Sequence, residues 1–360
     1  MPSAPTSEDL AAARAAAARP LASAVAADPG LPRRLATADW SAGQVDEGGQ
    51  FHRVLVLPGV GAVRIARTAG AAALLPGRMA MVAALGGTLG QGPTPALPFA
   101  VPAPLSEVVT APSGEAMGLR EGTAAVVQRF LPGQPHPPHE GDPELLRGVC
   151  EVLAGIETAP LVPHLGPPFG FRGPWAAEKV AVVQALPELL TRMYGSDAWT
   201  GSGAASADRW AGTVTALTGT ATRWTECPVV PPSLVHGDLA GHNMRWQRRS
   251  PGGDGGRWEL TGILDWDLAA VWDPALNPAY LALWHGEEKL EAIARDAAEA
   301  WRARVWLGCM ALESLYDASL REGPSRKEGP PHWAKLLRKV LPRIERAAAA
   351  EAVWRTGHTG

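Results

Sequence analysis

Two neighbouring stretches decide the fold of this chain, and they read SLVHGDLAGHNMRW (residues 233–246) and WELTGILDWDLAAVWDP (residues 258–274). Between them, SPGGDGG (residues 250–256) is typical of a turn, and the pieces on either side are strand-like. A hairpin built from these pieces brings Asn243 and Asp265 back towards each other. The pattern therefore predicts that Asp238, Asn243 and Asp265 converge at one end of a small sheet.

These three oxygen-bearing side chains suit phosphoryl transfer. The reaction needs a carboxylate that orients a hydroxyl group and accepts its proton, and oxygen ligands that hold Mg²⁺ on the nucleotide phosphates. Mg²⁺ is usually held by one or two carboxylates together with phosphate and water. Asp265 and the side-chain carbonyl of Asn243 fit the metal role, and Asp238 fits the role of base. The simpler alternative is an acidic loop and a hairpin without chemistry.

The same motifs resemble a known family. HGDLAGHN (residues 236–243) resembles the catalytic loop of the aminoglycoside phosphotransferase family, and ILDW (residues 263–266) with the later Asp273-Pro274 resembles its metal-binding motif. The family includes aminoglycoside, macrolide, choline, homoserine and fructosamine kinases. The resemblance implies that Asp238 is the base, that His236 braces the catalytic loop and that Asp273 supports the loop that follows.

The resemblance also implies a fold and a domain division. We expect an α+β, two-lobed protein-kinase-like fold, with a small antiparallel-sheet lobe and a larger, mainly helical lobe that carries the catalytic hairpin. Residues 1–131 would form the nucleotide-binding lobe with an N-terminal helical extension. Residues 132–360 would form the catalytic and substrate-binding lobe.

Composition limits the other possibilities. The chain has 360 residues, is 46% hydrophobic and carries a net charge of −3, which is enough apolar material for two lobes. Without a strong basic excess, nucleic acid is not the expected partner. We find no uninterrupted apolar run of membrane-spanning length. The three cysteines show neither metal spacing nor a disulfide framework. We expect a cytoplasmic monomer.

The first 28 residues are rich in alanine and favour a helix packed on the first lobe. Thr6 and Asp9 have the spacing of a capping box. A signal peptide is the alternative, but acidic residues precede the apolar run and Arg14 and Arg19 interrupt it.

Residues 39–67 read as three strands separated by turns. The turn EGGQFH (residues 47–52) contains Gly48 and Gly49, whose amides are candidates to cover phosphates, although a plain hairpin turn reads the same way. AVRIAR (residues 62–67) resembles the family's third strand, where a basic side chain reaches the nucleotide phosphates. No lysine precedes Lys179, so we assign this role to Arg64, with Arg67 as runner-up and a solvated strand charge as the alternative for either.

The next helix departs from the family pattern. RMAMVAAL (residues 78–85) occupies the place of a helix whose glutamate normally pairs with the basic residue of the third strand, and Met79 stands at that position. No Asp or Glu occurs between Phe51 and Ser106, so this helix cannot supply the usual ion pair. This departure leaves room for an inactive relative.

The segment LPFAVP (residues 97–102) is expected to enter the fourth strand, and it resembles a segment of macrolide phosphotransferases. Residues 124–130 read as the fifth strand. In this fold the end of that strand is the hinge that binds the purine, so the candidates for purine contact are the four residues Gln128, Arg129, Phe130 and Leu131. A plain linker is the alternative.

The larger lobe is expected to be helical. Asp142 is the N-cap of a helix that runs to about residue 157, and further helices are expected over 175–194, 205–225, 275–285, 287–322 and 333–354. Asn277 stands where the family usually has Asp. Thirteen of the fourteen tryptophans follow residue 170, which indicates a large buried body.

The resulting expectation is a phosphotransferase that moves the terminal phosphate of ATP or GTP, with Mg²⁺, to a hydroxyl group of a small molecule. An antibiotic-type acceptor is favoured, with a macrolide slightly ahead of an aminoglycoside. One reason is that acidic residues over 287–317 alternate with basic ones, as on solvated helix faces, and share their helices with many apolar side chains. The other is the resemblance of LPFAVP to a segment of macrolide phosphotransferases. The alternatives are a metabolic kinase acting on a sugar, homoserine or choline, and an inactive nucleotide-binding relative.

Overall fold

The computed structural model describes residues 3–49, 51–88, 99–110, 122–135, 141–166, 174–195, 197–200, 206–249, 257–320 and 333–357. The chain divides into two compact units. Unit 1 contains Met1–Pro138, Glu157–Leu165 and Gly241–Asp267, and unit 2 contains His139–Ile156, Gly166–Ala240 and Leu268–Gly360. The units interleave along the chain, because the hairpin segment returns to unit 1. The domain division at residue 131 stays a prediction. The hairpin turn at 250–256 and residues 97 and 98 lie outside the described residues.

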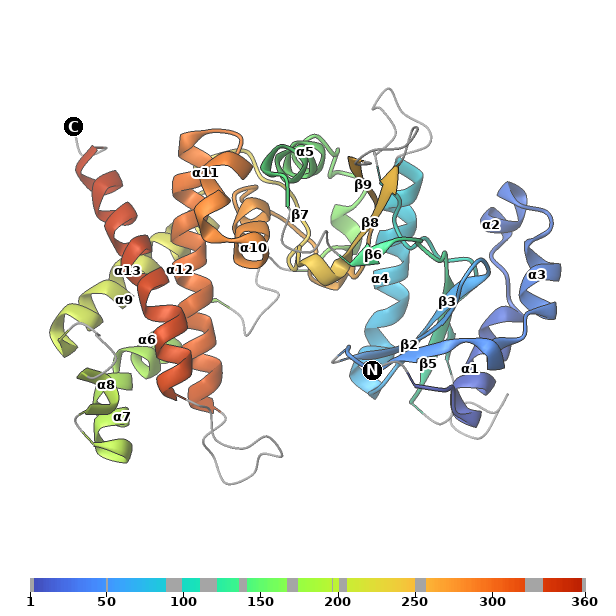
Figure 1. Ribbon diagram of the computed structural model, residues 1–360, viewed down its shortest axis with the longest axis horizontal. Helices are drawn as coiled ribbons and strands as arrows, with labels where there is room; N and C mark the ends of the chain where they lie inside the picture. Colours follow the sequence, from blue (N-terminus) through green and yellow to red (C-terminus); the bar gives the residue numbers. More distant parts are fainter. Residues whose placement is uncertain are drawn as a thin grey trace. The chain divides into compact units, whose positions relative to one another are not determined.

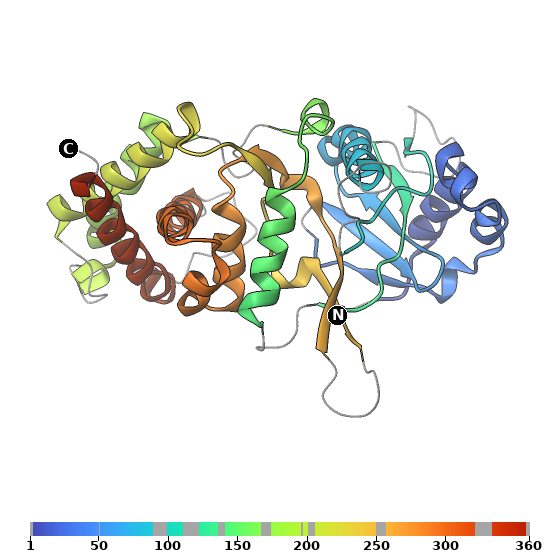
Figure 2. The ribbon, with the colours of Figure 1, turned by 90° about the horizontal axis from the view of Figure 1, so that it is seen from above.

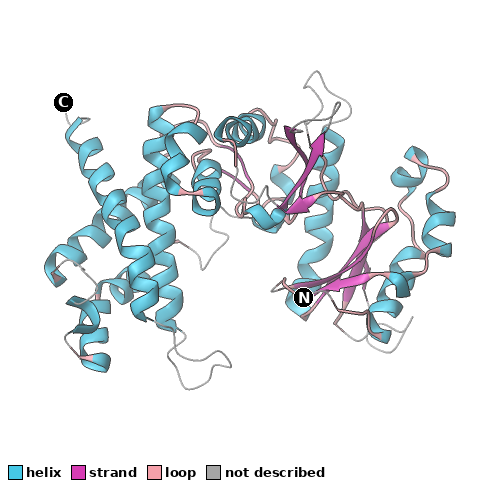
Figure 3. Ribbon diagram, in the orientation of Figure 1, coloured by secondary structure: helices cyan, strands magenta, loops and turns pink. Residues whose placement is uncertain are grey.

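Unit 1 is built on a five-stranded antiparallel sheet in the order β1-β2-β3-β5-β4, drawn in magenta in Figure 3. Its strands are β1 (Gln44–Asp46), β2 (His52–Leu57), β3 (Gly61–Ala66), β4 (Val109–Thr110) and β5 (Ala124–Gln128). The expected small antiparallel-sheet lobe is therefore confirmed. The assignment of its fourth strand was wrong, because the described part of residues 97–102 pairs elsewhere: the Ala100 N–H donates to the Thr261 carbonyl at 2.9 Å.

The two faces of this sheet carry different helices (Figure 1). Side chains alternate between faces along a strand, so Val63 and Val127 point into an apolar cluster that contains the buried alanines of α1 (Ser7–Ala17). Thr6 and Asp9 form the predicted capping box of α1, and its packing on the sheet confirms the expected N-terminal helix. Two shorter helices follow it, α2 (Ala22–Ala27) and α3 (Leu31–Thr37).

Helix α4 (Ala69–Thr88) contacts the sheet at β3 and β5 and is longer than the expected 78–85. Among the described residues it is the one helix long and apolar enough to cross a membrane, with a mean hydropathy of 1.4 over Ala69–Gly86. The same composition suits a helix that packs on a sheet. The expected absence of a membrane partner stays a prediction.

A second sheet of unit 1 has three antiparallel strands, β6 (Gln134–Pro135), β8 (Met244–Arg249) and β9 (Arg257–Ile263), in the order β6-β8-β9. The pairing of β8 with β9 confirms the hairpin predicted from the sequence. Its register places Met244 opposite Ile263, so the residues just beyond this pair meet at the end of the hairpin.

Unit 2 is mainly helical, as expected (Figure 3). Its α-helices are α5 (Pro143–Ala154), α6 (Ala177–Gln184), α7 (Leu186–Tyr194), α8 (Asp197–Thr200), α9 (Ala207–Glu226), α10 (Leu276–His285), α11 (Leu290–Ile293), α12 (Ala297–Leu320) and α13 (Trp333–Gly357). Helix α12 packs against α9, α10 and α13, and Figure 2 shows it nearly end-on. The predicted N-cap of α5 is confirmed, since Asp142 accepts a hydrogen bond from the Glu144 N–H.

Two helices expected to be continuous are broken. Residues 175–194 form α6 and α7, because a new helix begins at Leu186 with Pro187 in its first turn. Residues 287–322 are broken where Ala294 becomes extended, and Asp296 then accepts from the Glu299 N–H in the first turn of α12. The sequence analysis also missed a two-stranded sheet in unit 2, formed by β7 (Ser233–Val235) and β10 (Ala270–Trp272).

Candidate functional site

The hairpin brings the two candidate metal ligands to one point of unit 1. The Leu264 N–H donates to the Asn243 carbonyl at 2.7 Å, which fixes the residue before Asp265 against Asn243. Asn243 is buried, whereas half of the Asp265 side chain is exposed. Asp265 has a φ of 56°, a left-handed conformation that is uncommon outside glycine. The chain thus keeps an exposed carboxylate at the end of β9 in an unusual backbone state, as functional sites often do.

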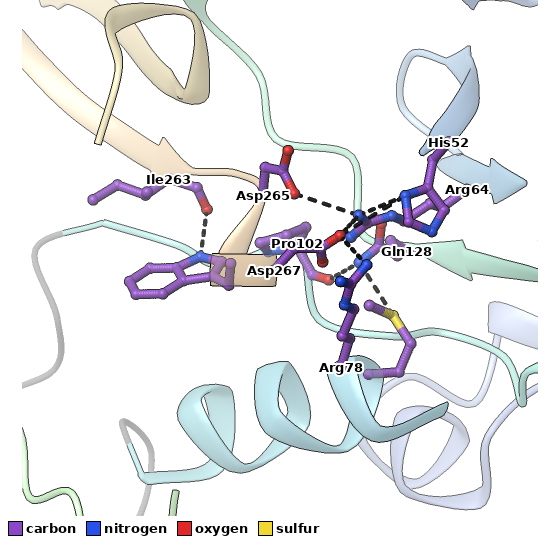
Figure 4. Close-up of polar contacts among 10 residues, drawn as sticks. His52, Arg64, Arg78, Pro102, Gln128, Ile263, Asp265 and Asp267 are labelled. Carbon is purple, nitrogen blue, oxygen red and sulfur yellow. Dashed lines mark hydrogen bonds and ion pairs between the residues drawn. The ribbon is translucent and has the colours of Figure 1, made fainter. Parts of the chain in front are cut away.

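Beside Asp265 lies an ion cluster that the sequence analysis did not predict (Figure 4). On β3, the Arg64 guanidinium pairs through Nη2 with the Asp267 carboxylate and lies 3.3 Å from Asp265 Oδ1. From α4, Arg78 Nη1 donates to the same Asp267 oxygen at 2.6 Å. One carboxylate, whose side chain is 9% exposed, thus holds two guanidinium groups from different elements.

His52, the first residue of β2, completes this cluster. Its Nδ1 lies 2.9 Å from Arg64 Nη2 and accepts a hydrogen bond, because the guanidinium has only donors. Burial lowers the pKa of His52 to about 3, and the charge of Arg64 adds to this effect. His52 is therefore neutral near pH 7 and adds no charge. Its Nε2 is buried and has no hydrogen-bond partner in the described part of the chain.

Asp267 thus takes the place of the missing helix glutamate as the acidic partner of Arg64. The helix supplies a cation, Arg78, and the acid that pairs with Arg64 comes from the loop after β9. Met79 is buried and its sulfur lies 3.3 Å from the Gln128 amide nitrogen. Two sequence signals point to the cluster: Arg78 is the single charged residue of α4, and Asp267 follows Asp265 by two positions. Neither signal shows which residue is the partner of Arg78 or of Asp267.

Asp265 and Asn243 fit a magnesium ion by chemistry. Both supply hard oxygen atoms, and Mg²⁺ sites on nucleotides use few protein ligands. Within the described residues no group of three or more His, Cys, Asp or Glu is placed to hold a metal ion. Desolvation raises the pKa of the Asp265 carboxyl, and the negative charge of Asp267 raises it further. The positive charges of Arg64 and Arg78 lower it, but by less. A bound cation would offset this crowding of negative charge.

The glycine turn before β2 is exposed at both Gly48 and Gly49. The Gly48 N–H donates to Asp46 Oδ1 at 2.8 Å. A Cβ atom at Gly49 would lie 2.7 Å from the His52 carbonyl oxygen, so this turn requires glycine there. Arg67, the runner-up for the phosphate role, donates to the Glu47 carbonyl at 2.7 Å and so supports the turn. These contacts favour Arg64 for the phosphate role.

The four predicted hinge residues differ in their surroundings. The Gln128 side chain is buried and donates to the Pro102 carbonyl at 2.9 Å, and the Arg129 N–H donates to the Ala103 carbonyl at 2.8 Å. Leu131 is buried as well. Arg129 and Phe130 help to line a cavity of about 730 Å³ whose other walls include residues of α2 and α3. None of the ion-cluster residues lines that cavity, so the purine role of this segment stays a prediction.

In unit 2, the catalytic-loop motif follows β7. The Gly237 backbone has a φ of 82°, and a Cβ atom there would overlap the Leu268 carbonyl, so this position requires glycine. His236 is fully buried, and its Nδ1 accepts from the Asp238 N–H at 3.2 Å. The imidazole therefore holds the backbone of the loop that carries Asp238, as a bracing residue does.

Asn277, a departure from the family pattern, also holds this loop. Its Oδ1 accepts from the His236 N–H at 3.1 Å and its Nδ2 donates to the Leu234 carbonyl at 3.0 Å. An amide can both accept and donate, whereas a carboxylate only accepts. Asp238 also influences its surroundings electrostatically: burial raises the pKa of Tyr280 well above its usual value, and Asp238 adds to this effect.

Asp273 is a buried junction in unit 2. Its Oδ1 accepts from the Ala275 N–H at 3.0 Å and from Arg302 Nε at 3.2 Å, and its Oδ2 accepts from Trp306 Nε1 at 2.9 Å. It therefore fixes the end of β10, which pairs with β7, to the core helix α12. This geometry fits the predicted loop-supporting role.

Several acidic residues of the segment 287–317 have cationic partners. These partners are Arg343 and Arg346 for Glu287, Arg304 for Glu291, Arg295 for Glu299 and Lys179 for Glu313. The interpretation as solvated helix faces was wrong for Glu299 and Glu313, which are buried. Because their charges are already paired, these carboxylates do not form an acidic wall for a polycationic ligand.

Comparison with known proteins gives the family. Residues 44–312 match the sequence pattern of a family described as "Phosphotransferase enzyme family". Viomycin phosphotransferase from Streptomyces vinaceus is 30% identical over 305 residues, which cover 79% of this chain and 91% of that protein.

Solved structures of low sequence identity share the fold. The GDP and kanamycin complex of APH(2")-IIia superposes with a TM-score of 0.55 at 14% identity, covering 90% of this chain and 99% of that one. The streptomycin and ATP complex of APH(2")-IIa gives a TM-score of 0.51 at 11% identity, covering 92% and 98%. The kinase-like fold expected from the sequence is therefore confirmed.

Proposed function

Because the chain belongs to the phosphotransferase enzyme family, we propose that it transfers the terminal phosphate of ATP or GTP to a hydroxyl group of an antibiotic. The observation that carries this proposal is the cluster of unit 1, in which Arg64 on β3 is held by Asp267 within 3.3 Å of the candidate metal ligand Asp265. The cluster suits the binding of a nucleotide with its metal ion. The presence of Asp238, a base for the acceptor hydroxyl, together with Asn243 and Asp265 favours an active enzyme over an inactive nucleotide-binding relative.

Each part of the site has a role in this proposal. Asn243 and Asp265 would hold Mg²⁺, which when bound neutralises charge on the nucleotide phosphates. Arg64 donates to phosphate oxygens, for which a planar guanidinium is well suited. Gly48 and Gly49 offer backbone amides at the turn before β2. Charge developing on the transferred group is stabilised chiefly by such donors and cations.

Asp238 acts on the acceptor. Its carboxylate orients the acceptor hydroxyl and accepts the proton as the oxygen attacks the terminal phosphorus, and the nucleoside diphosphate leaves. His236 and Asn277 hold the backbone around Asp238, so the carboxylate does not have to be ordered when the substrate binds. This division of labour explains why His236 is buried and bonded rather than free to react.

Viomycin is the first acceptor to test. The relative that is 30% identical is named for that antibiotic, and the alignment covers 91% of its length. The preference for a macrolide rested on the segment LPFAVP and on apolar side chains of α10 and α12. Of these side chains Trp306 and Leu312 are core residues, whereas Trp284 is exposed. We therefore place viomycin ahead of a macrolide and of the aminoglycosides.

The test is a transfer assay with a matched acceptor panel. Purified protein is incubated with Mg²⁺ and γ-labelled ATP or GTP, together with viomycin, kanamycin, streptomycin, erythromycin, homoserine, choline or a hexose. We expect label on viomycin and a product heavier by one phosphoryl group. Label only on homoserine, choline or the sugar would replace the antibiotic acceptor by a metabolic one, and label on none of them would contradict the proposal.

A further inference from the structure

Helix α4 presents a cation to the loop that follows β9. Arg78 Nη1 donates to Asp267 Oδ2 at 2.6 Å, and Arg64 Nη2 pairs with the same oxygen (Figure 4). The Asp267 side chain is 9% exposed and the Arg78 side chain 20%. The carboxylate is thus nearly enclosed, whereas part of the Arg78 guanidinium stays open to solvent.

Asp267 alone does not balance the two cations that it holds. Two guanidinium groups share this one carboxylate, and His52 is neutral at pH 7 because burial lowers its pKa to about 3. The other nearby anion, Asp265, is half exposed and lies 3.3 Å from Arg64. A buried ion pair that serves only to hold a fold needs close compensation of its charges. Here the charges balance only through Asp265, and once Asp265 holds a cation the two guanidinium groups share a single carboxylate, which suits a bound anion.

The donors of the cluster are also incompletely used. Arginine has five N–H donors, and among the described residues Asp267 is the partner found for Arg78. The imidazole of His52 accepts through Nδ1, so its hydrogen is on Nε2, which is buried without a partner in the same set of residues. An unmade hydrogen bond of a buried donor costs about 1–3 kcal/mol. These donors therefore favour an oxygen-rich anion next to the cluster.

We infer that Arg78 is a second phosphate-binding residue, which acts with Arg64 on the triphosphate of the donor, and that Asp267 is the positioning residue that orients both. The inference rests on the proposed function, since it takes the phosphates to lie beside Arg64. It reverses the polarity of the ion pair expected from the family: the helix delivers a cation to the phosphates, and the loop after β9 delivers the acid that holds it.

Direct binding of nucleotides tests Arg78 without any acceptor. Calorimetry in Mg²⁺ compares ATP, GTP and the matching nucleosides on the wild type, Arg78→Met, Arg78→Lys and the control Arg34→Met, whose arginine pairs with Asp28 at the surface of unit 1. We expect Arg78→Met to raise the Kd of the preferred triphosphate about tenfold, as for a charged hydrogen bond. The Kd of the nucleoside should change less than about twofold, and Arg78→Lys should fall between the wild type and Arg78→Met.

Three outcomes overturn the role of Arg78. A triphosphate Kd for Arg78→Met equal to that of the wild type, or of Arg34→Met, removes phosphate binding. An equal loss of affinity for nucleoside and triphosphate shows that Arg78 only holds the fold. Absence of nucleotide binding by the wild type overturns both this inference and the proposed function, whereas failure to label any acceptor with nucleotide binding intact contradicts the proposed function alone.

Asp267→Asn tests the positioning role by separating affinity from turnover. Loss of the carboxylate leaves both cations free for phosphate but no longer orients them. We therefore expect kcat to fall about tenfold or more while the Kd of the triphosphate changes less than about threefold. A Kd that rises by the same factor as kcat falls would instead assign Asp267 to simple support of the fold.

Discussion

Asp273→Ala should destabilise unit 2 strongly. The carboxylate accepts three hydrogen bonds, from the Ala275 N–H, Arg302 Nε and Trp306 Nε1, and the Arg302 side chain is only 7% exposed. Removing one partner of a buried ion pair leaves an uncompensated charge, which costs about 3–5 kcal/mol. For a unit of this size, each kcal/mol lowers Tm by roughly 2–4 °C, so we expect a fall of roughly 6–20 °C.

Two variants make this prediction specific. Asp273→Asn keeps an acceptor oxygen but removes the charge, so its cost should be smaller, about 1.5–3 kcal/mol. Asp28→Ala removes an exposed ion pair with Arg34, in which both side chains are more than 40% exposed, and should lower Tm far less than Asp273→Ala does. Scanning calorimetry measures all three, since it resolves two transitions if the units unfold separately. The reasoning is refuted if Asp273→Ala lowers Tm no more than Asp28→Ala does.

Three further predictions concern unit 1. The folded-state pKa of His52 is about 3 against an ordinary 6.5, so its contribution to stability is complete above pH 6.5 and is lost as the pH falls towards 3. By pH 5 the free energy of unfolding of the wild type should fall by about 2 kcal/mol, a loss that His52→Gln does not share. Denaturant unfolding of both proteins at pH 7 and pH 5 measures this difference. Asp265→Ala should reduce nucleotide affinity in Mg²⁺ to the value that the wild type shows in EDTA, and calorimetry that finds the same metal-dependent gain in the variant would remove Asp265 from the metal site. Arg64→Ala should raise the nucleotide KM about tenfold or more, the scale of a charged hydrogen bond, whereas the reverse order for Arg64→Ala and Arg67→Ala in steady-state kinetics would show that Arg67 is the phosphate ligand.

The hairpin was predictable because its signals are local. A glycine-rich turn between two strand-like pieces fixes which residues meet, and Leu264 bonds to Asn243 at the end of that hairpin. The five-stranded sheet was predictable for a similar reason except at β4, which is two residues long and too short to show a periodic pattern. The expected fourth strand failed because Ala100 finds its backbone partner on β9 instead.

The ion cluster lay beyond the reach of sequence patterns. The contact between Arg64 and Asp267 joins residues 203 positions apart, and Arg78 reaches Asp267 across 189 positions. Spacing rules apply within one helix, strand or turn and do not specify such partners. The burial of His52, and with it the low pKa, likewise depends on neighbours from other elements. The sequence showed that the usual acidic partner was missing from α4, but its replacement required the folded chain.

Comparison of the turnover of Asp238→Asn with that of the wild type shows whether Asp238 is the base. The substitution keeps the size of the side chain and removes its ability to accept a proton, while the bonds that His236 and Asn277 make to the loop backbone remain. With labelled nucleotide, Mg²⁺ and the acceptor found in the panel, we predict that kcat falls about 10²–10⁴-fold while the nucleotide Kd stays within about twofold. Equal kcat values for the variant and the wild type would contradict this prediction, because Asp238 would then not be the base of a phosphotransferase.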